Sequence, residues 1–240
     1  MSVAGEAPGK VNALLAYEGI RRKIMEGEYQ PAQRLIEQRI AVELGLSRTP
    51  VREAMRRLEA EGLVRSEPNR GAMVRSVTVD EIHDIYGLRA QLESYGAGLA
   101  AQRAQDSDLE KIDAGIERFG SAIAVMHTDE LASVREVHDA NEQIHAAVVA
   151  SARHRRLGTL LARTVDVPLI FQSFRRFDHD QAARSDLFHR MIRDAIARRD
   201  ADRAANLMTE HILQGRDVLL ESLETRDDGS VDLFRTSGSA

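Results

Sequence analysis

Apolar positions in the first third of the chain recur at helical spacing and fall into three short segments. In residues 11–28 the apolar side chains return every three or four positions, which predicts a first helix. A second helix is expected over residues 35–45, which close on a glycine, a natural helix terminator. A third helix is expected to begin at a cap provided by Ser47 or Thr49 and to end near Glu61.

The pattern changes after the third helix to two short runs that contain valine and methionine. Residues 63–77 place a "PNRG" turn between these runs, a combination typical of a β-hairpin. Two helices joined by a tight glycine-containing turn and followed by a hairpin predict a winged helix-turn-helix.

From Thr78 onward the strand pattern disappears and helical periods take over. The expected helices are 79–104, 107–125, 129–151, 153–175, 181–198 and 201–223. The sequence therefore predicts a mainly α fold, in which a winged helix-turn-helix with a small β-hairpin wing precedes an all-α helical bundle. The expected divisions are a first domain at 10–76, a helical domain at 78–223 and a flexible tail at 224–240.

The composition narrows the class of protein. The chain has no cysteine, which excludes disulfides and thiolate metal sites. Its longest apolar runs, 146–150 and 167–171, are far too short to span a bilayer, so we expect a cytoplasmic protein with no membrane partner. Residues 1–78 hold 13 Lys and Arg against 10 Asp and Glu (+3), and residues 79–240 hold 20 against 28 (−8). A mildly basic front on an acidic body fits a small DNA-binding module attached to another domain.

The third predicted helix has two different faces. Arg48, Arg52 and Arg56 lie at i, i+4 and i+8 and therefore share one side. A separate side carries the apolar residues Val51, Ala54, Met55 and Leu58. A cationic face at the start of a helix suits the major groove of double-stranded DNA, where arginine pairs with guanine or neutralises phosphate. The alternative is a solvated charged face, because arginine is common throughout this chain.

Two neighbouring features fit the same interpretation. The hydroxyl groups of Ser47 and Thr49 can add short contacts to phosphate or bases. The predicted hairpin tip carries Arg70 and Gly71, and an arginine at the tip of a wing fits a minor groove.

The segment "LSRTPVREAMRRLEAEGLV" and the "NRGAMV" that follows it closely resemble the DNA-binding domain of the GntR family of bacterial transcription regulators. The resemblance covers roughly residues 10–76. It implies operator-DNA contacts at Arg48, Thr49 and Arg52, a wing position at Gly71, and one further contact at either Gln38 or Arg39.

Histidines are the candidate ligands of the helical domain. Asn141 and His145 lie one turn apart on one face of a predicted helix, and His189 and His211 lie on two later helices. Three imidazoles and a polar oxygen can surround a divalent ion, with zinc the first choice and nickel or another metal possible. The alternative is that these histidines are surface or hydrogen-bonded residues.

Residues 78–223 resemble the FadR C-terminal domain, FCD, which accompanies this winged helix in one large GntR subfamily. The resemblance rests on "LRAQLE" at 88–93, on the His145 step and on the two later histidines. In metal-containing members an Asp and three His bind a divalent ion at the floor of a pocket, and a small carboxylate often binds above it. Here Asn141 stands at the position of the Asp, and we expect the nearby His138 and Asp139 to point to other faces.

"LRAQLE" also contains Arg89, which matches an arginine that lines the effector pocket in many relatives. An arginine fork is a natural partner for the carboxylate of an effector. The alternative is an ion pair within the helix, from Arg89 to Glu93 four residues later.

The function expected from these features is a transcription regulator and not an enzyme. We expect a homodimeric repressor that binds an inverted repeat in operator DNA and responds to a small organic-acid effector held above the metal. One alternative is a regulator that responds directly to the metal ion. A His-zinc hydrolase is the other, but no HExxH-type spacing provides the general base that it needs.

Overall fold

The computed structural model describes residues 8–25, 28–67, 71–128, 130–164, 167–223 and 230–231. Its contacts divide the chain into two compact units, which are described in turn. The first unit combines Met1–Thr78 with Glu224–Ala240, and the second unit is Val79–Leu223.

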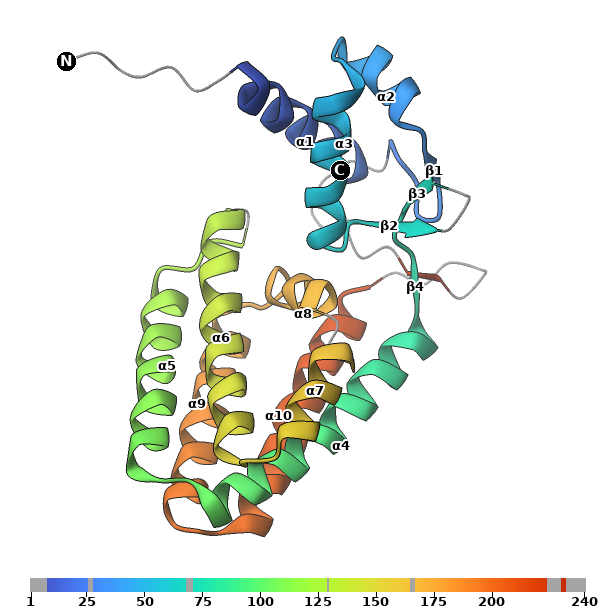
Figure 1. Ribbon diagram of the computed structural model, residues 1–240. Helices are drawn as coiled ribbons and strands as arrows, with labels where there is room; N and C mark the ends of the chain where they lie inside the picture. Colours follow the sequence, from blue (N-terminus) through green and yellow to red (C-terminus); the bar gives the residue numbers. More distant parts are fainter. Residues whose placement is uncertain are drawn as a thin grey trace, which may run out of the picture. The chain divides into compact units, whose positions relative to one another are not determined.

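Three helices form the first unit: α1 (Pro8–Met25), α2 (Glu37–Leu44) and α3 (Arg48–Ala60) (Figure 1). Gly45 ends α2 in the left-handed conformation, with φ of 66°, as the sequence predicts. Ser47 occupies the cap position of α3, but its side chain accepts no capping hydrogen bond, so the expected hydroxyl cap is wrong. The helix begins instead at Arg48 with Pro50 in its first turn, where a missing N–H costs little.

A three-stranded antiparallel sheet in the order β1-β3-β2 completes the winged helix. β2 (Val64–Glu67) and β3 (Gly71–Val74) form the predicted hairpin, with Val64 opposite Val74. β1 (Arg34–Leu35) pairs with β3, although the sequence assigned Leu35 to the second helix. A two-residue strand has no measurable period, and the buried Leu35 fits the apolar pattern of either element equally well.

The chain forms one more short sheet, which contradicts two expectations. β4 (Val77–Thr78) pairs antiparallel with β5 (Ser230–Val231). Strand structure therefore continues to Thr78, and part of the expected flexible tail is paired. Val231 is buried, and the burial of its side chain favours this pairing.

The second unit is a bundle of helices (Figure 1). Its described helices are α4 (Val79–Arg103), α5 (Asp106–Ala124), α6 (Leu131–Ser151), α7 (Arg155–Thr164), α8 (Val167–Phe174), α9 (His179–Ala197) and α10 (Ala201–Glu221). α10 packs along α4, and α5 packs against α6 and α9. Together with the winged helix, this bundle confirms the predicted fold class.

One predicted helix of the bundle is divided. The sequence predicts a single helix over residues 153–175, whereas the structure has α7 and α8 there. Pro168 lies in the first turn of α8 and lacks a backbone N–H. It therefore cannot continue a helix from α7, but it is tolerated where a new helix begins.

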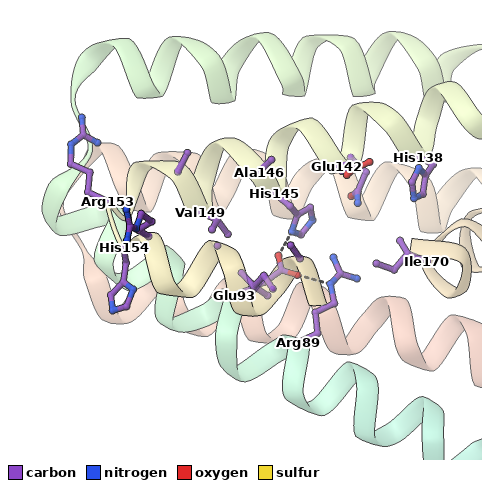
Figure 2. Close-up of a pocket in the computed structure, with 16 residues that line it drawn as sticks. Arg89, Glu93, His138, Glu142, His145, Ala146, Val149, Arg153, His154 and Ile170 are labelled. Carbon is purple, nitrogen blue, oxygen red and sulfur yellow. Dashed lines mark hydrogen bonds and ion pairs between the residues drawn. The ribbon is translucent and has the colours of Figure 1, made fainter. Parts of the chain in front are cut away.

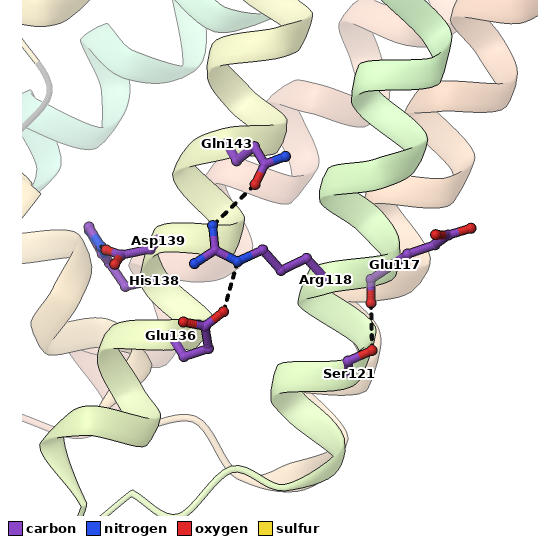
Figure 3. A network of polar contacts seen from close by, with 7 residues as sticks. All are labelled: Glu117, Arg118, Ser121, Glu136, His138, Asp139 and Gln143. Carbon is purple, nitrogen blue, oxygen red and sulfur yellow. Dashed lines mark hydrogen bonds and ion pairs between the residues drawn. The ribbon is translucent and has the colours of Figure 1, made fainter.

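A polar network on the outer side of the bundle joins α5 to α6 (Figure 3). Arg118 of α5 donates from Nε to Glu136 at 2.7 Å and from Nη1 to Gln143 at 3.1 Å, both on α6. The three side chains are exposed or half-buried, so the network adds little stability. It lies beside Asp139, on the solvent side of the helix that carries His145.

Candidate functional site

Each of the two units contains one candidate binding site. The first site lies on α3. The predicted apolar face of this helix is buried against α1 and α2, and its buried members include Val51, Ala54, Met55 and Leu58. Arg48 and Arg52 are exposed on the opposite side, as the sequence predicts. Burial of the apolar face therefore leaves Arg48 and Arg52 exposed to solvent, where they can contact a ligand.

An acidic residue stands between these two arginines and was missed by sequence reasoning. Oε2 of Glu37, at the start of α2, lies 3.6 Å from Nη2 of Arg48 and 3.4 Å from Nε of Arg52. Such exposed ion pairs are weak, so they hold the guanidinium groups near one another without preventing contact with phosphate. No short-range pattern links Glu37 to residues 11 and 15 positions later on another helix.

The remaining DNA-binding candidates lie at different places on the first unit. Gln38, Arg39, Ser47 and Thr49 are all exposed. Gly71 is exposed at the start of β3 with φ of 78°, a left-handed conformation that favours glycine. Arg70 lies outside the described residues, so its expected place at the wing tip stays a prediction.

The second site is the histidine cluster inside the bundle. His145 of α6, His189 of α9 and His211 of α10 are buried, and one ring nitrogen from each lies within 4.8 Å of the others. Nε2 of His145 lies 3.1 Å from Nε2 of His211. The structure thus brings together the three histidines that the sequence proposed as ligands, from helices distant in the chain.

Several nitrogens of the cluster have no hydrogen-bond partner within the described part of the chain. These are Nδ1 and Nε2 of His189 and Nδ1 of His211. Buried polar atoms are rarely left unpaired, and an ion is one of the groups that satisfies them. Three imidazoles fit the preference of zinc and similar divalent ions, so these residues suit a metal.

A buried carboxylate orients the cluster from α4. Glu93 accepts a hydrogen bond from Nδ1 of His145 through one oxygen, and its other oxygen accepts from Nε of Arg89 at 2.5 Å (Figure 2). A carboxylate only accepts, so the proton of His145 is on Nδ1 and Nε2 faces the cluster. Proteins commonly use a carboxylate hydrogen-bonded to a metal-ligating histidine to set the tautomer and orientation of its ring.

The charges around Glu93 determine its ionisation. Burial opposes the charged carboxylate, but the guanidinium of Arg89 and the imidazole of His145 outweigh burial and hold the pKa of Glu93 well below its usual range. Sequence reasoning considered Glu93 only as an alternative partner of Arg89. Its spacing four residues after Arg89 was the available signal, but the contact with His145 spans 52 positions.

The same burial keeps two of the histidines neutral. Desolvation lowers the pKa of His189 well below its usual value, and the nearby His145 and Arg89 lower it further. Desolvation likewise lowers the pKa of His211, with His189 and His145 adding to the effect. Neutral imidazole is the form that binds metal, so both residues are ready to act as ligands at neutral pH.

A cavity of about 760 Å³ opens beside the cluster and is lined by α4, α6, α7 and α8 (Figure 2). Arg89 lines it, as expected of an effector-binding residue, but its Nε is committed to Glu93. The ion pair left open as an alternative is therefore present, and the remaining guanidinium nitrogens are the part of Arg89 available to a ligand.

Two further residues of α6 reach the same cavity. Asn141 is buried and lines the wall, one turn before His145. His138 is also buried and lines the cavity, so the expectation that it points to another face is wrong. The reason is helical geometry, because seven residues are close to two full turns and return His138 to the side of His145. Asp139 is exposed, as expected.

Comparison with known families identifies both units. Residues 13–74 match the family described as "Bacterial regulatory proteins, gntR family", and residues 84–214 match the FCD domain. The chain belongs to the GntR family. The predicted family is confirmed, and this GntR protein is a DNA-binding transcription regulator and not an enzyme.

Several relatives match this GntR regulator over most of the length of both proteins. It is 27% identical to the HTH-type transcriptional regulator YdhC of Bacillus subtilis (strain 168), over 87% of this chain and 91% of that protein. It is 30% identical to the probable D-xylose utilization operon transcriptional repressor of Paenarthrobacter nicotinovorans, over 79% and 80%. The HTH-type transcriptional repressor GlaR of Escherichia coli (strain K12) is 26% identical, over 89% and 98%.

Solved structures share the fold of this GntR regulator. Lar, which controls the expression of the Listeria monocytogenes agr system, has a TM-score of 0.63 at 19% identity, over 90% of this chain and 98% of that one. McbR/YncC of E. coli has a TM-score of 0.58 at 19% identity, over 88% and 97%. In the part of the chain that the structure describes, no helix is both long and apolar enough to cross a membrane.

Proposed function

We propose that this regulator is a homodimeric repressor whose affinity for operator DNA is controlled by a small organic acid. The acid binds in the cavity of the helical unit, above a divalent ion held by His145, His189 and His211 with Asn141 beside it. The observation that carries the proposal is the buried cluster of three histidines with unpaired nitrogens, which lies against a cavity lined by Arg89. Zinc is the ion that this set of ligands favours.

The DNA-binding half of the proposal rests on α3 and its surroundings. In a homodimer, two copies of α3 would enter successive major grooves and read an inverted repeat with half-sites about 10 base pairs apart. Arg48, Thr49 and Arg52 would make the contacts in the groove, with Ser47 and either Gln38 or Arg39 beside them. Several named relatives are repressors, which supports the same direction of control here.

The effector would act through a difference in its affinity for two arrangements of the dimer. A coupling of about 1–3 kcal/mol, typical of allosteric proteins, would lower operator affinity about 5- to 150-fold. The guanidinium of Arg89 would bind the acid, while the metal would anchor its carboxylate. Glu93 would keep both Arg89 and His145 in place.

A binding experiment on DNA tests the first half. A fragment enriched by the protein from random-sequence DNA is titrated with wild type and with Arg52→Ala, and anisotropy gives the dissociation constants. We expect Arg52→Ala to weaken binding about 10- to 100-fold with an unchanged melting temperature. Undiminished affinity of the folded variant for the same fragment would remove Arg52 from the interface. Arg22→Ala, an exposed arginine of α1, is the control.

A metal titration tests the second half and the alternative of a metal-responsive regulator. Zinc added to chelator-treated protein should bind at one ion per chain, and His189→Ala should lose that ion. If chelation alone releases the DNA and no organic acid has an effect, the protein responds to the metal itself. If chelation leaves DNA binding unchanged but abolishes the response to an acid, the metal anchors the effector.

A further inference from the structure

The cavity beside the histidine cluster is much longer than a short organic acid. On α6 its lining extends from His138 to Ala150, which corresponds to roughly 18 Å at the rise of an α-helix, and it continues to Arg153 beyond the end of that helix. Its volume of about 760 Å³ is in the range of sites for drug-sized ligands. A hydroxy acid or dicarboxylate of a few carbon atoms would occupy only the part next to His145.

The wall of the cavity changes its chemistry along this length. Arg89 and His145 lie near the middle of the lining beside the metal-binding cluster, with His138 and Ile170 on one side of them and Arg153 and His154 at the far end on the other (Figure 2). Between His145 and Arg153 the lining includes the aliphatic side chains Ala146, Val149 and Ala150, and α7 adds Leu161 and Ala162. A sugar acid would leave its hydroxyl groups unpaired against these residues, while a chain of methylene groups would be buried favourably.

The far end of the cavity offers a second positive charge. Arg153 is already paired, because Nη1 lies 2.9 Å from Oδ2 of Asp108. Arg155 also lines the cavity, and among the described residues no acidic side chain pairs with its guanidinium. His154 accepts a hydrogen bond at Nδ1 from the backbone N–H of Leu157 at 3.1 Å, which leaves Nε2 as the donor.

We infer that the effector is an unbranched α,ω-dicarboxylate with an aliphatic body, which rests on the proposed function of this cavity as the effector site. One carboxylate lies at Arg89 and the histidine cluster, and the other lies at Arg155 and His154. His145 and Ser151, the last residue of α6, are six residues apart, about 9 Å, and His154 and Arg155 follow soon after the end of that helix. A chain of about eight to ten carbon atoms covers this span when extended. Suberate and sebacate have this length.

If this arrangement is correct, the affinity for a dicarboxylate depends on the length of its carbon chain. Each methylene buried against the aliphatic wall tightens binding about fourfold. Affinity therefore rises from succinate to suberate and sebacate, and then stops rising once the second carboxylate has passed Arg155. A monocarboxylate of equal length gains the methylene contacts but not the second ion pair.

The test is a calorimetric titration of the zinc-loaded full-length protein with succinate, suberate, sebacate and octanoate. We expect suberate and sebacate to bind at least about tenfold more tightly than succinate. Arg155→Met should weaken suberate about three- to tenfold and leave octanoate unchanged. Arg156→Met, which changes the exposed neighbour outside the cavity lining, is the matched control and should alter neither ligand.

A second variant tests the middle of the cavity. Gly158 lines it, and a Cβ built at this glycine meets no atom within 4 Å, so a larger side chain fits without strain. Gly158→Leu should weaken sebacate at least about tenfold and keep the binding of succinate. Succinate as tight as sebacate, or a Gly158→Leu variant that binds sebacate normally, would overturn the inference while leaving a small-acid effector in place. Failure of every acid to bind the zinc-loaded protein would overturn the proposed function as well.

Discussion

Glu93 of α4 hydrogen-bonds Nδ1 of His145 of α6, although 52 residues separate them in the chain. The same carboxylate is paired with Arg89, so one buried acid connects a candidate metal ligand to a candidate effector-binding group. Any movement of Arg89 toward an acid changes the charge that Glu93 presents to His145. Under the proposed function, Glu93 would be a direct route by which effector binding and metal binding affect one another.

The first prediction concerns this carboxylate. Glu93→Gln removes the charge that orients His145, so we expect zinc affinity to fall about 10- to 100-fold. Competition with a chromophoric chelator measures the affinity. Glu142→Gln, which changes an exposed acid on the lining of the same cavity, is the control and should keep wild-type affinity. Equal zinc affinities for the two variants would show that Glu93 does not support the site.

The second prediction concerns pH. In the folded, metal-free protein the pKa values of His189 and His211 lie below those of the unfolded chain, so unfolding takes up protons as the pH falls. Stability is therefore complete above about pH 6.5 and declines below it, by about 1.4 kcal/mol per histidine between about pH 7.5 and about pH 5.5. The depressed pKa of Glu93 contributes only at lower pH, because its stabilisation is lost below about pH 4.5.

Urea unfolding in chelator at the two pH values measures this effect. His189→Leu should reduce the difference in unfolding free energy by about half, since one of the two buried histidines is gone. His83→Gln, which changes an exposed histidine of α4, should leave the difference as it is in wild type. A wild-type stability that does not change between the two pH values would contradict the assignment of neutral buried histidines.

The sequence predicts features that depend on neighbouring residues better than features that depend on contacts between distant parts of the chain. The amphipathic period of α3 is local, and it correctly separates the buried Leu58 from the exposed Arg52. The three histidines were candidate ligands from their residue type, and a family resemblance supplied the long-range information that they lie together. Glu93 was missed as a partner of His145 because the contact depends on how α4 packs against α6, which no local pattern encodes.

The sequence predicted neither the short strand pairing nor the extent of the cavity. β5 contains only Ser230 and Val231, too few residues for a period, and its pairing partner lies at Val77–Thr78. Residues of both α7 and α8 line the cavity, although the sequence predicted one continuous helix there. The sequence therefore indicated Arg89 as a candidate effector-binding residue but did not indicate that Arg155 lines the same cavity.

The third prediction concerns Asn141. Replacing its neutral amide by a carboxylate in Asn141→Asp places a charged oxygen one turn from His145, where it can join the metal ligands. We expect divalent-metal affinity to rise about tenfold, because ligand charge is a principal determinant of affinity. Without metal, burial opposes the new charge, so the same variant should melt below wild type in chelator and above it in zinc. A melting temperature that changes equally in both conditions would show that residue 141 does not reach the ion.

The last prediction concerns the packing that holds α6 and its histidine in place. A Cβ built at Gly115 of α5 lies 2.8 Å from Cγ1 of Ile144, the residue before His145, so Gly115→Ala forces α5 and α6 apart. We expect a loss of about 1–3 kcal/mol in unfolding free energy and weaker zinc binding, because His145 moves with its helix. Gly87→Ala is the matched control, since its Cβ meets no atom within 4 Å in the middle of α4 and should add about 0.5–1 kcal/mol. Urea unfolding and zinc competition on both variants measure these effects. If Gly115→Ala proved as stable as Gly87→Ala, the close contact between α5 and α6 would not be what positions His145.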